Sequence, residues 1–186
     1  MKGVVFLDRD GVINQDSPDY IKTPDEFHFI PGSPEAIARL TRAGLAVMVI
    51  TNQSLIGRKM ADTETLAAIF DKMKKGVNAA GGKIRDIFYC PHLPSAGCEC
   101  RKPEPGLIFQ ARDRYAIDLQ RSVMVGDSAK DIEAGLNAGC GHTVLVRTGN
   151  GALALEILAG KQIQPDHVAT DLSAAANWIT TRLFLS

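Results

Sequence analysis

Short apolar runs rich in β-branched residues are the feature of this sequence that most restricts its fold. Such runs are typical of buried strands, and they occur at residues 3–7, 45–50, 84–89, 122–125 and 143–146, with a shorter one at 167–169. Helical patterns lie between them, at residues 33–43, 62–80, 105–115, 128–138 and 153–159 and from Asp171 onward. Apolar strands that alternate with helices are typical of a parallel sheet covered on both faces. The sequence therefore predicts an α/β fold, with a doubly wound, mainly parallel, Rossmann-like sheet and helices on both faces.

The size and charge of the chain limit what it can be. A chain of 186 residues that is 45% hydrophobic can bury one core, so we expect residues 1–186 to form a single domain. The 21 basic and 21 acidic residues cancel, and the sequence has no basic stripe that would follow a nucleic acid backbone. The apolar residues 3–7 are too few for a signal peptide, and the longest apolar run, 45–50, is far too short to span a membrane. We therefore expect a cytoplasmic monomer without nucleic acid or membrane partners.

Residue types at several boundaries predict local structure. Ser33 precedes Pro34, so we expect the Ser33 hydroxyl to cap a helix that closes near Gly44. In the last helix, Trp178 and Leu183 are expected to pack inward. The turn Thr148-Gly149-Asn150-Gly151 has no phosphate-loop signature before it. We interpret it as an ordinary turn.

Aspartates follow two of the predicted strands. Asp8-Arg9-Asp10 comes directly after the first strand, and residues two apart in extended chain project to the same side. Both carboxylates can therefore face one site, while Arg9 is expected to point away. Asp127 ends the fourth strand, and ligands of such sheets bind beyond the carboxyl ends of the strands. Carboxylates this close need a cation or a shared proton, and carboxylate oxygens are what Mg²⁺ binds together with phosphate and water.

Two further side chains belong to this predicted site. Thr51 follows the second strand and Lys102 follows a cysteine-rich segment, and both side chains can hold phosphate oxygens. A lone aspartate at a strand end commonly does no more than cap the next loop or helix. Aspartates at two strand ends together with Thr51 and Lys102 favour a phosphoryl-transfer site instead.

These residues resemble the four motifs of the haloacid dehalogenase-like phosphatases, over most of the chain. The motifs occur in order as Asp8-Arg9-Asp10-Gly11, Thr51-Asn52-Gln53, Lys102, and Gly126-Asp127 followed by Asp131. The resemblance implies that Asp8 attacks phosphorus and that Asp10 acts as acid and then as base. It implies that Mg²⁺ is held by Asp8, Asp127 and the main-chain carbonyl of Asp10. Thr51 and Lys102 would stabilise the transferring phosphoryl group, which suits a reaction that is among the slowest without a catalyst.

A cluster of cysteines and one histidine predicts a second metal site. Its members are Cys90, His92, Cys98 and Cys100. Three thiolates and an imidazole form the ligand set of a closed tetrahedral zinc site, and in a reducing compartment they favour metal binding over disulfides. A closed site leaves no position for substrate, so Zn²⁺ would shape the loop 90–100 and place Arg101 and Lys102 in the cleft. Cys140 stands alone and is expected to be a small buried side chain.

Within the family, the segment from Cys90 to Pro103 resembles a small zinc-bearing branch with two principal activities. One is removal of the 7-phosphate of D-glycero-D-manno-heptose 1,7-bisphosphate, a step toward nucleotide-activated heptose for lipopolysaccharide. The other is hydrolysis of histidinol phosphate, which the five-residue gap in the zinc loop also resembles, and this alternative stays open. The resemblance implies a small phosphorylated sugar as substrate, held by Asp16, Asp19, Tyr20, Asn52, Gln53, Ser54 and Arg101. The planar guanidinium of Arg101 would clamp the distal phosphate.

The spacing of the motifs leaves no room for a cap domain. We therefore expect an open, capless site whose selectivity comes from the loops 14–29 and 54–59 and from the cysteine-rich loop. Leu55 and Lys59 stand where glycines are usual in the family, and Ser128 stands where a basic residue is common. A different class of function is a zinc-stabilised binding module that has lost catalysis, but both acidic residues of the first motif are present.

Overall fold

A computed structural model describes residues 3–182 of the chain. Its six strands are β1 (Val4–Leu7), β2 (Ala46–Asn52), β3 (Ile84–Cys90), β4 (Val123–Gly126), β5 (His142–Val146) and β6 (His167–Ala169). Its α-helices are α1 (Ser33–Arg42), α2 (Thr63–Ala79), α3 (Gly106–Tyr115), α4 (Ala129–Ala138), α5 (Gly151–Gly160) and α6 (Leu172–Arg182), with short 3₁₀ helices η1 (Pro94–Ala96) and η2 (Leu119–Arg121). Within residues 3–182, no helix is long and apolar enough to cross a lipid bilayer.

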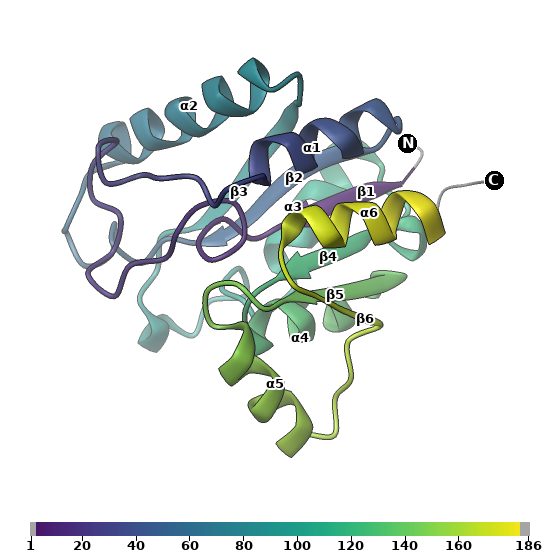
Figure 1. The fold of residues 1–186 in the computed structure, drawn as a ribbon. Coiled ribbons are helices and arrows are strands. Elements are labelled where there is room, and N and C mark those ends of the chain that lie inside the picture. The colour runs from purple at the N-terminus through teal and green to yellow at the C-terminus, as the bar shows by residue number, and fades with distance from the viewer. Residues whose placement is uncertain (1–2, 183–186) are drawn as a thin grey trace.

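The strands form one parallel sheet in the order β3-β2-β1-β4-β5-β6. This arrangement (Figure 1) confirms the predicted α/β fold and its doubly wound sheet, and the element boundaries differ from the predicted ones by a few residues. The chain winds outward from β1 in one direction through β2 and β3, and in the other through β4, β5 and β6. The winding direction changes between β1 and β4, and in such sheets a crevice for ligands opens at that point.

Alternate residues of the central strands face opposite layers of helices. In β1, Val5 and Leu7 belong to a core that includes residues of α1, α2 and α6. Val4 and Phe6 belong to a second core with residues of α3 and α4. Figure 1 shows α1, α2 and α6 together on one side of the sheet. Because both faces are covered, the central strands are apolar throughout, as the sequence indicates.

The predicted cap of α1 is wrong. The residue before the helix is Gly32, with a left-handed φ of 83°, and Ser33 is already helical. The Ser33 hydroxyl donates instead to the carbonyl of Ile13 at 2.6 Å. This buried hydrogen bond ties α1 to the loop that follows β1. The Ser33 hydroxyl therefore does not cap the helix.

The last helix packs as predicted where it can be described. Trp178 is half-buried against the larger core, and its ring stacks on that of His167 with centroids 4.7 Å apart. Leu183 lies outside the described residues. Cys140 is buried, as expected.

Candidate active site

A cavity of about 530 Å³ opens at the carboxyl ends of the strands. It brings together most of the residues that the sequence predicts for the site: Asp8, Asp10, Asp16, Tyr20, Thr51, Asn52, Gln53, Ser54, Arg101, Lys102 and Asp127. Asp19 is the exception, because its side chain is exposed and is not among the residues that line this cavity. The cavity also has a wall that sequence reasoning missed, which is formed by residues of α4 and α5.

Three carboxylates converge at the point where β1 and β4 end. One oxygen each of Asp8, Asp127 and Asp131 lies within 4.8 Å of the others. Burial, with the neighbouring carboxylates, raises the pKa of Asp8 well above its ordinary value, although Lys102 opposes the shift. Burial and the charge of Asp131 raise the pKa of Asp127 to about 7. Such closely spaced acids call for a cation, and oxygen ligands of this kind suit Mg²⁺.

Lys102 supplies one positive charge within this group. Its buried ammonium lies 2.9 Å from Oδ1 of Asp8, contacts Asp131, and donates to the carbonyl of Ile50 at 2.8 Å. Burial alone would lower the pKa of Lys102, but the charges of Asp131 and Asp8 raise it above its ordinary value. Lys102 is therefore a fixed cation, held by three acceptors in the direction of Asp8.

Asn52 fixes the backbone at Lys102. Its Nδ2 donates to the carbonyl of Lys102 at 3.2 Å, and its Oδ1 accepts from the amide of Lys102 at 3.1 Å. The sequence predicts a substrate contact for Asn52. In the structure both hydrogen-bonding ends of the side chain join β2 to the segment that follows the cysteine-rich loop.

Arg9 does not point away from the site, contrary to the prediction. β1 ends at Leu7, so the alternation of an extended strand no longer applies at residues 8–10. The Arg9 guanidinium turns back and binds Asp10, with Nε 3.0 Å from Oδ1 and Nη2 at 2.7 and 2.9 Å from the two oxygens. Because Arg9 is only 1% exposed, its charge requires a buried partner.

Asp10 is surrounded by hydrogen-bond donors. Besides Arg9, it accepts from Nδ2 of Asn14 at 2.9 Å and from Nε2 of Gln53 at 3.0 Å. Burial alone would raise the pKa of Asp10, but the Arg9 charge and the hydrogen bonds from Arg9, Asn14 and Gln53 hold that pKa below its ordinary value. Asp10 is therefore a carboxylate in this arrangement, ready to accept a proton.

Thr51 lies at the base of the cavity and is almost fully buried. Its hydroxyl oxygen accepts from Nε2 of Gln53 at 2.8 Å, so Gln53 bridges Thr51 and Asp10. The hydroxyl hydrogen of Thr51 remains available for an acceptor in the cavity.

The turn after β5 positions Asp127, which the sequence did not indicate. The amide of Asn150 donates to Oδ2 of Asp127 at 2.8 Å. Gly11 and Gly149 have left-handed φ values of 76° and 58°, and a Cβ atom at either position would collide with the Asp127 carboxylate. The hydroxyl of Thr148 closes the contact by donating to the carbonyl of Gly11 at 2.6 Å. The glycines of the turn were the signal that could have indicated this close approach.

Two residues in the loops that follow β1 and β2 have left-handed backbone conformations. Tyr20 has a φ of 65° and lines the cavity, and Lys59 has a φ of 56° in the loop that follows β2. Lys59 occupies a position where glycine is common in the family that the sequence resembles, and its left-handed conformation gives the physical reason for a glycine there. Leu55 also stands where glycine is usual in that family. Its side chain is buried in the core, so the leucine adds packing contacts that a glycine could not make.

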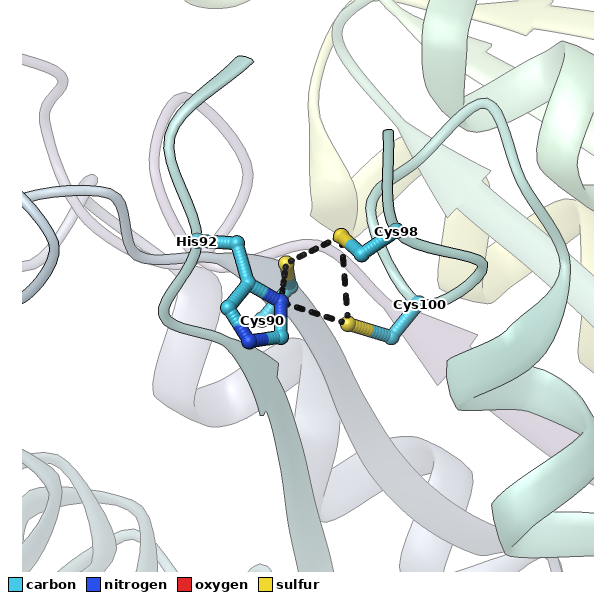
Figure 2. Close-up of side chains that lie close together, drawn as sticks. All are labelled: Cys90, His92, Cys98 and Cys100. Carbon is cyan, nitrogen blue, oxygen red and sulfur yellow. Dashed lines mark hydrogen bonds between the residues drawn. The ribbon is translucent and has the colours of Figure 1, made fainter. Parts of the chain in front are cut away.

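The cysteine-rich loop brings its four predicted ligands together. Figure 2 shows the side chains of Cys90, His92, Cys98 and Cys100 turned toward one another. Nδ1 of His92 lies 3.6 Å from Sγ of Cys90 and 3.3 Å from Sγ of Cys100, and Sγ of Cys98 lies 3.6 Å and 3.5 Å from the other two sulfurs. All four cysteines of the chain are free thiols.

These spacings fit a tetrahedral zinc ion. With a zinc–sulfur distance of about 2.3 Å, the sulfurs of a regular tetrahedron lie about 3.8 Å apart. The observed separations are close to that value, and no ligand position is left for a substrate. The loop joins the end of β3 to Arg101 and Lys102, so its shape determines where those two side chains enter the cavity.

Comparisons with known proteins identify the family of this chain. A family model described as HAD-hydrolase-like matches residues 99–175. The D-glycero-beta-D-manno-heptose-1,7-bisphosphate 7-phosphatase of Bordetella bronchiseptica is 47% identical over 173 residues, which cover 93% of this chain and 95% of that protein. The protein of the same name from Pseudomonas aeruginosa is 46% identical over 95% of this chain and 97% of its own length.

Solved structures of proteins with this family name are also similar to this chain. The D,D-heptose 1,7-bisphosphate phosphatase of B. bronchiseptica, complexed with magnesium and phosphate, has a TM-score of 0.90 at 46% identity and covers 96% of this chain and 98% of its own. The D,D-heptose 1,7-bisphosphate phosphatase of Burkholderia thailandensis has a TM-score of 0.75 at 37% identity, covering 97% of this chain and 100% of its own.

Proposed function

This chain belongs to the family of heptose-1,7-bisphosphate 7-phosphatases within the HAD-like hydrolases, and from that premise we propose that it removes the 7-phosphate of D-glycero-D-manno-heptose 1,7-bisphosphate. The product is the heptose 1-phosphate together with inorganic phosphate. Because the relatives described above are named for the β anomer, we propose the β-configured bisphosphate as the substrate.

The convergence of Asp8, Asp127 and Asp131 around Lys102 carries this proposal. A buried cluster of three carboxylates is costly unless it binds a cation, and a single lysine offsets one of the charges. Asp8 and Asp127 are therefore the residues that would hold Mg²⁺, with the main-chain carbonyl of Asp10 as a third ligand. When bound, Mg²⁺ neutralises charge on the phosphoryl oxygens.

In the first step, a carboxylate oxygen of Asp8 attacks phosphorus. The bond from phosphorus to the C7 oxygen breaks, and Asp10 gives its proton to that oxygen. Lys102 and the Thr51 hydroxyl stabilise the phosphoryl oxygens from the protein side. The donors around Asp10 disfavour the protonated form that this step needs, so leaving-group departure slows as the pH rises.

In the second step, water attacks the phosphorus of the aspartyl-phosphate. Asp10 accepts a proton from that water, the bond between phosphorus and Asp8 breaks, and inorganic phosphate leaves. Arg9, Asn14 and Gln53 favour the carboxylate form of Asp10, which is the form that accepts a proton. The site has no cap domain, so water reaches the intermediate directly, and hydrolysis is favoured over transfer to another alcohol.

The cysteine cluster has a structural part in this proposal. Cys90, His92, Cys98 and Cys100 would hold Zn²⁺ and thereby shape the loop that places Arg101 and Lys102. Arg101 is half-buried, lines the cavity and donates to the carbonyl of His92 at 3.2 Å. Its other N–H groups are free to bind the distal phosphate of the substrate.

Steady-state kinetics on two substrates test the proposal. Purified protein with Mg²⁺ should hydrolyse the heptose 1,7-bisphosphate with a kcat/KM at least 100-fold above that for histidinol phosphate, and chelation of Mg²⁺ should abolish turnover. Asp8→Asn should give no acid-stable phosphoprotein and no phosphate release. Substantial turnover by Asp8→Asn would contradict the mechanism. Turnover of neither substrate by zinc- and magnesium-loaded protein would favour a binding module.

A further inference from the structure

The positively charged side chains that line the active-site cavity differ in whether they already have an acidic partner. Three are paired: Arg9 with Asp10, Lys102 with Asp8 and Asp131, and Lys161 with Glu133 at 2.8 Å. The other two are Arg101 and Lys130, and within residues 3–182 no carboxylate lies within ion-pair distance of either. The uncompensated positive charge of the cavity is therefore concentrated on these two residues.

Arg101 and Lys130 lie at one place, where the cavity meets its neighbour. A second cavity of about 500 Å³ adjoins the zinc loop, and the residues that line both cavities are Arg101, Lys102 and Lys130. Lys102 is occupied by the carboxylates of the reaction centre. The far part of the second cavity is lined by Glu99 and Glu104, which repel an anion. An anionic group that reaches away from Asp8 is thus favoured at the junction.

The backbone of Lys130 is well anchored while its side chain stays free. It is the second residue of α4, whose start is fixed by Ser128, with the amide and hydroxyl of Ser128 donating to Asp131 at 3.0 and 2.7 Å. Asp131 also pairs with Lys102. The Lys130 side chain is exposed. It can therefore move over a limited volume at the junction without disturbing the reaction centre.

We propose that Lys130 acts with Arg101 to bind the distal phosphate of the substrate and sets the preference for a bisphosphate over a monophosphate. This inference rests on the proposed function. A phosphate dianion at the junction would meet the planar fork of Arg101 from the zinc loop and the flexible ammonium of Lys130 from α4. A sugar with one phosphate, bound at Asp8, leaves both cations without a ligand.

The ratio of two catalytic efficiencies tests this role. The heptose 1,7-bisphosphate and the heptose 7-phosphate are compared in the wild type, in Lys130→Gln and in Lys130→Arg. Loss of one charge-assisted hydrogen bond should lower the ratio of kcat/KM for bisphosphate to that for monophosphate on the order of 10-fold in Lys130→Gln, mainly through KM. Lys130→Arg should restore most of it. Lys75→Gln, an exposed change on α2 away from both cavities, is the matched control and should leave the ratio within twofold.

Each outcome decides a different point. An unchanged ratio in Lys130→Gln, or an equal loss on both substrates, would overturn the role of Lys130 while leaving the proposed function in place. A wild-type protein that shows no preference for the bisphosphate over the heptose 7-phosphate would also overturn the role of Lys130, whereas absence of turnover of the bisphosphate would overturn the proposed function. Raising the ionic strength should reduce the wild-type preference more than that of Lys130→Gln, which keeps only the charge of Arg101 at the junction.

Discussion

The ammonium of Lys102 lies 2.9 Å from Oδ1 of Asp8, and Asn52 binds the backbone of Lys102 from the neighbouring strand. The residue that would attack phosphorus is therefore paired with a cation that is fixed both by its side chain and by its main chain. Asp131 takes the other side of the same ammonium. This arrangement couples the charge state of Asp8 to the position of the loop that contains the cysteine cluster.

Replacement of Lys102 by methionine should lower kcat by about 100- to 1,000-fold, the usual loss when one fixed donor to a developing charge is removed. The charge of Lys102 opposes the rise in the pKa of Asp8, so that pKa should rise further in the variant. Single-turnover formation of the phosphoprotein, measured against pH, checks both effects. Asn52→Ala should show a smaller loss because Lys102 keeps its charge, and equal losses in the two variants would contradict the separate role of the ammonium.

Removal of zinc should destabilise the protein more than the substitution Cys140→Ala does. Chelation, or Cys98→Ser, should lower the Tm by several degrees and lower activity, because the loop loses its shape and Lys102 its approach to Asp8. Calorimetry gives the Tm, a phosphate-release assay gives the activity, and mass spectrometry gives the zinc content. Cys140→Ala is the matched control and should retain zinc. An unchanged Tm in fully zinc-free protein would contradict a structural ion.

The Mg²⁺-free protein should lose stability as the pH rises from about 4 to about 7. Burial first, and then the charge of Asp131, raises the pKa of Asp127 from 3.8 to about 7 in the folded state. The folded state therefore holds a proton that the unfolded state has released, and this contribution to stability is present below pH 4 and lost by pH 7. Mg²⁺ competes with that proton, so the rise in Tm that it causes should be several degrees larger at pH 8 than at pH 5. Equal Mg²⁺ responses at the two pH values, in thermal scans with Asp127→Asn as the control, would argue against Asp127 as a ligand.

Lys59→Gly should stabilise the protein by about 0.5–1 kcal/mol. A left-handed backbone costs a residue with a Cβ atom about 1–2 kcal/mol, and part of that gain is lost to the greater freedom of glycine in the unfolded chain. The φ of 56° at Lys59 places it in this class. Urea denaturation should show the gain, with Lys59→Ala as a control that removes the side chain but keeps the strain. A stabilisation of similar size in Lys59→Ala would assign the effect to the lysine side chain.

The fold could be predicted closely from the sequence because the strands and helices are indicated by short stretches of neighbouring residues. Apolar strands such as Val4–Leu7 and Val123–Gly126 stand out in the chain, and their parallel arrangement follows from the helices between them. The ligand-type residues could be found for the same reason, since Asp8 and Asp127 directly follow those strands.

What the sequence did not indicate depends on where the strands stop and on contacts between distant segments. The end of β1 at Leu7 is what turns Arg9 toward Asp10. The contact of Asn150 with Asp127 joins the loop after β4 to the loop after β5. The hydrophobic pattern of the sequence contains no indication of such a contact between loops. The wall of α5 was missed because Leu153 and Ile157 look like ordinary core residues of an amphipathic helix, whereas they are 56% and 42% exposed at the cavity.

The two glycines that press on Asp127 set a limit on how this protein can change. At Gly11 and Gly149 a hydrogen atom is the largest substituent that fits, so no other natural amino acid can stand at either position without moving the carboxylate. The position of the Asp127 oxygen that is proposed to bind Mg²⁺ is thus set by close contacts with the main chain at Gly11 and Gly149, and not by side-chain packing that could adjust. Substrate range can diversify through α4, α5 and the loops 14–29 and 54–59, while these two positions stay fixed for as long as the chemistry is retained.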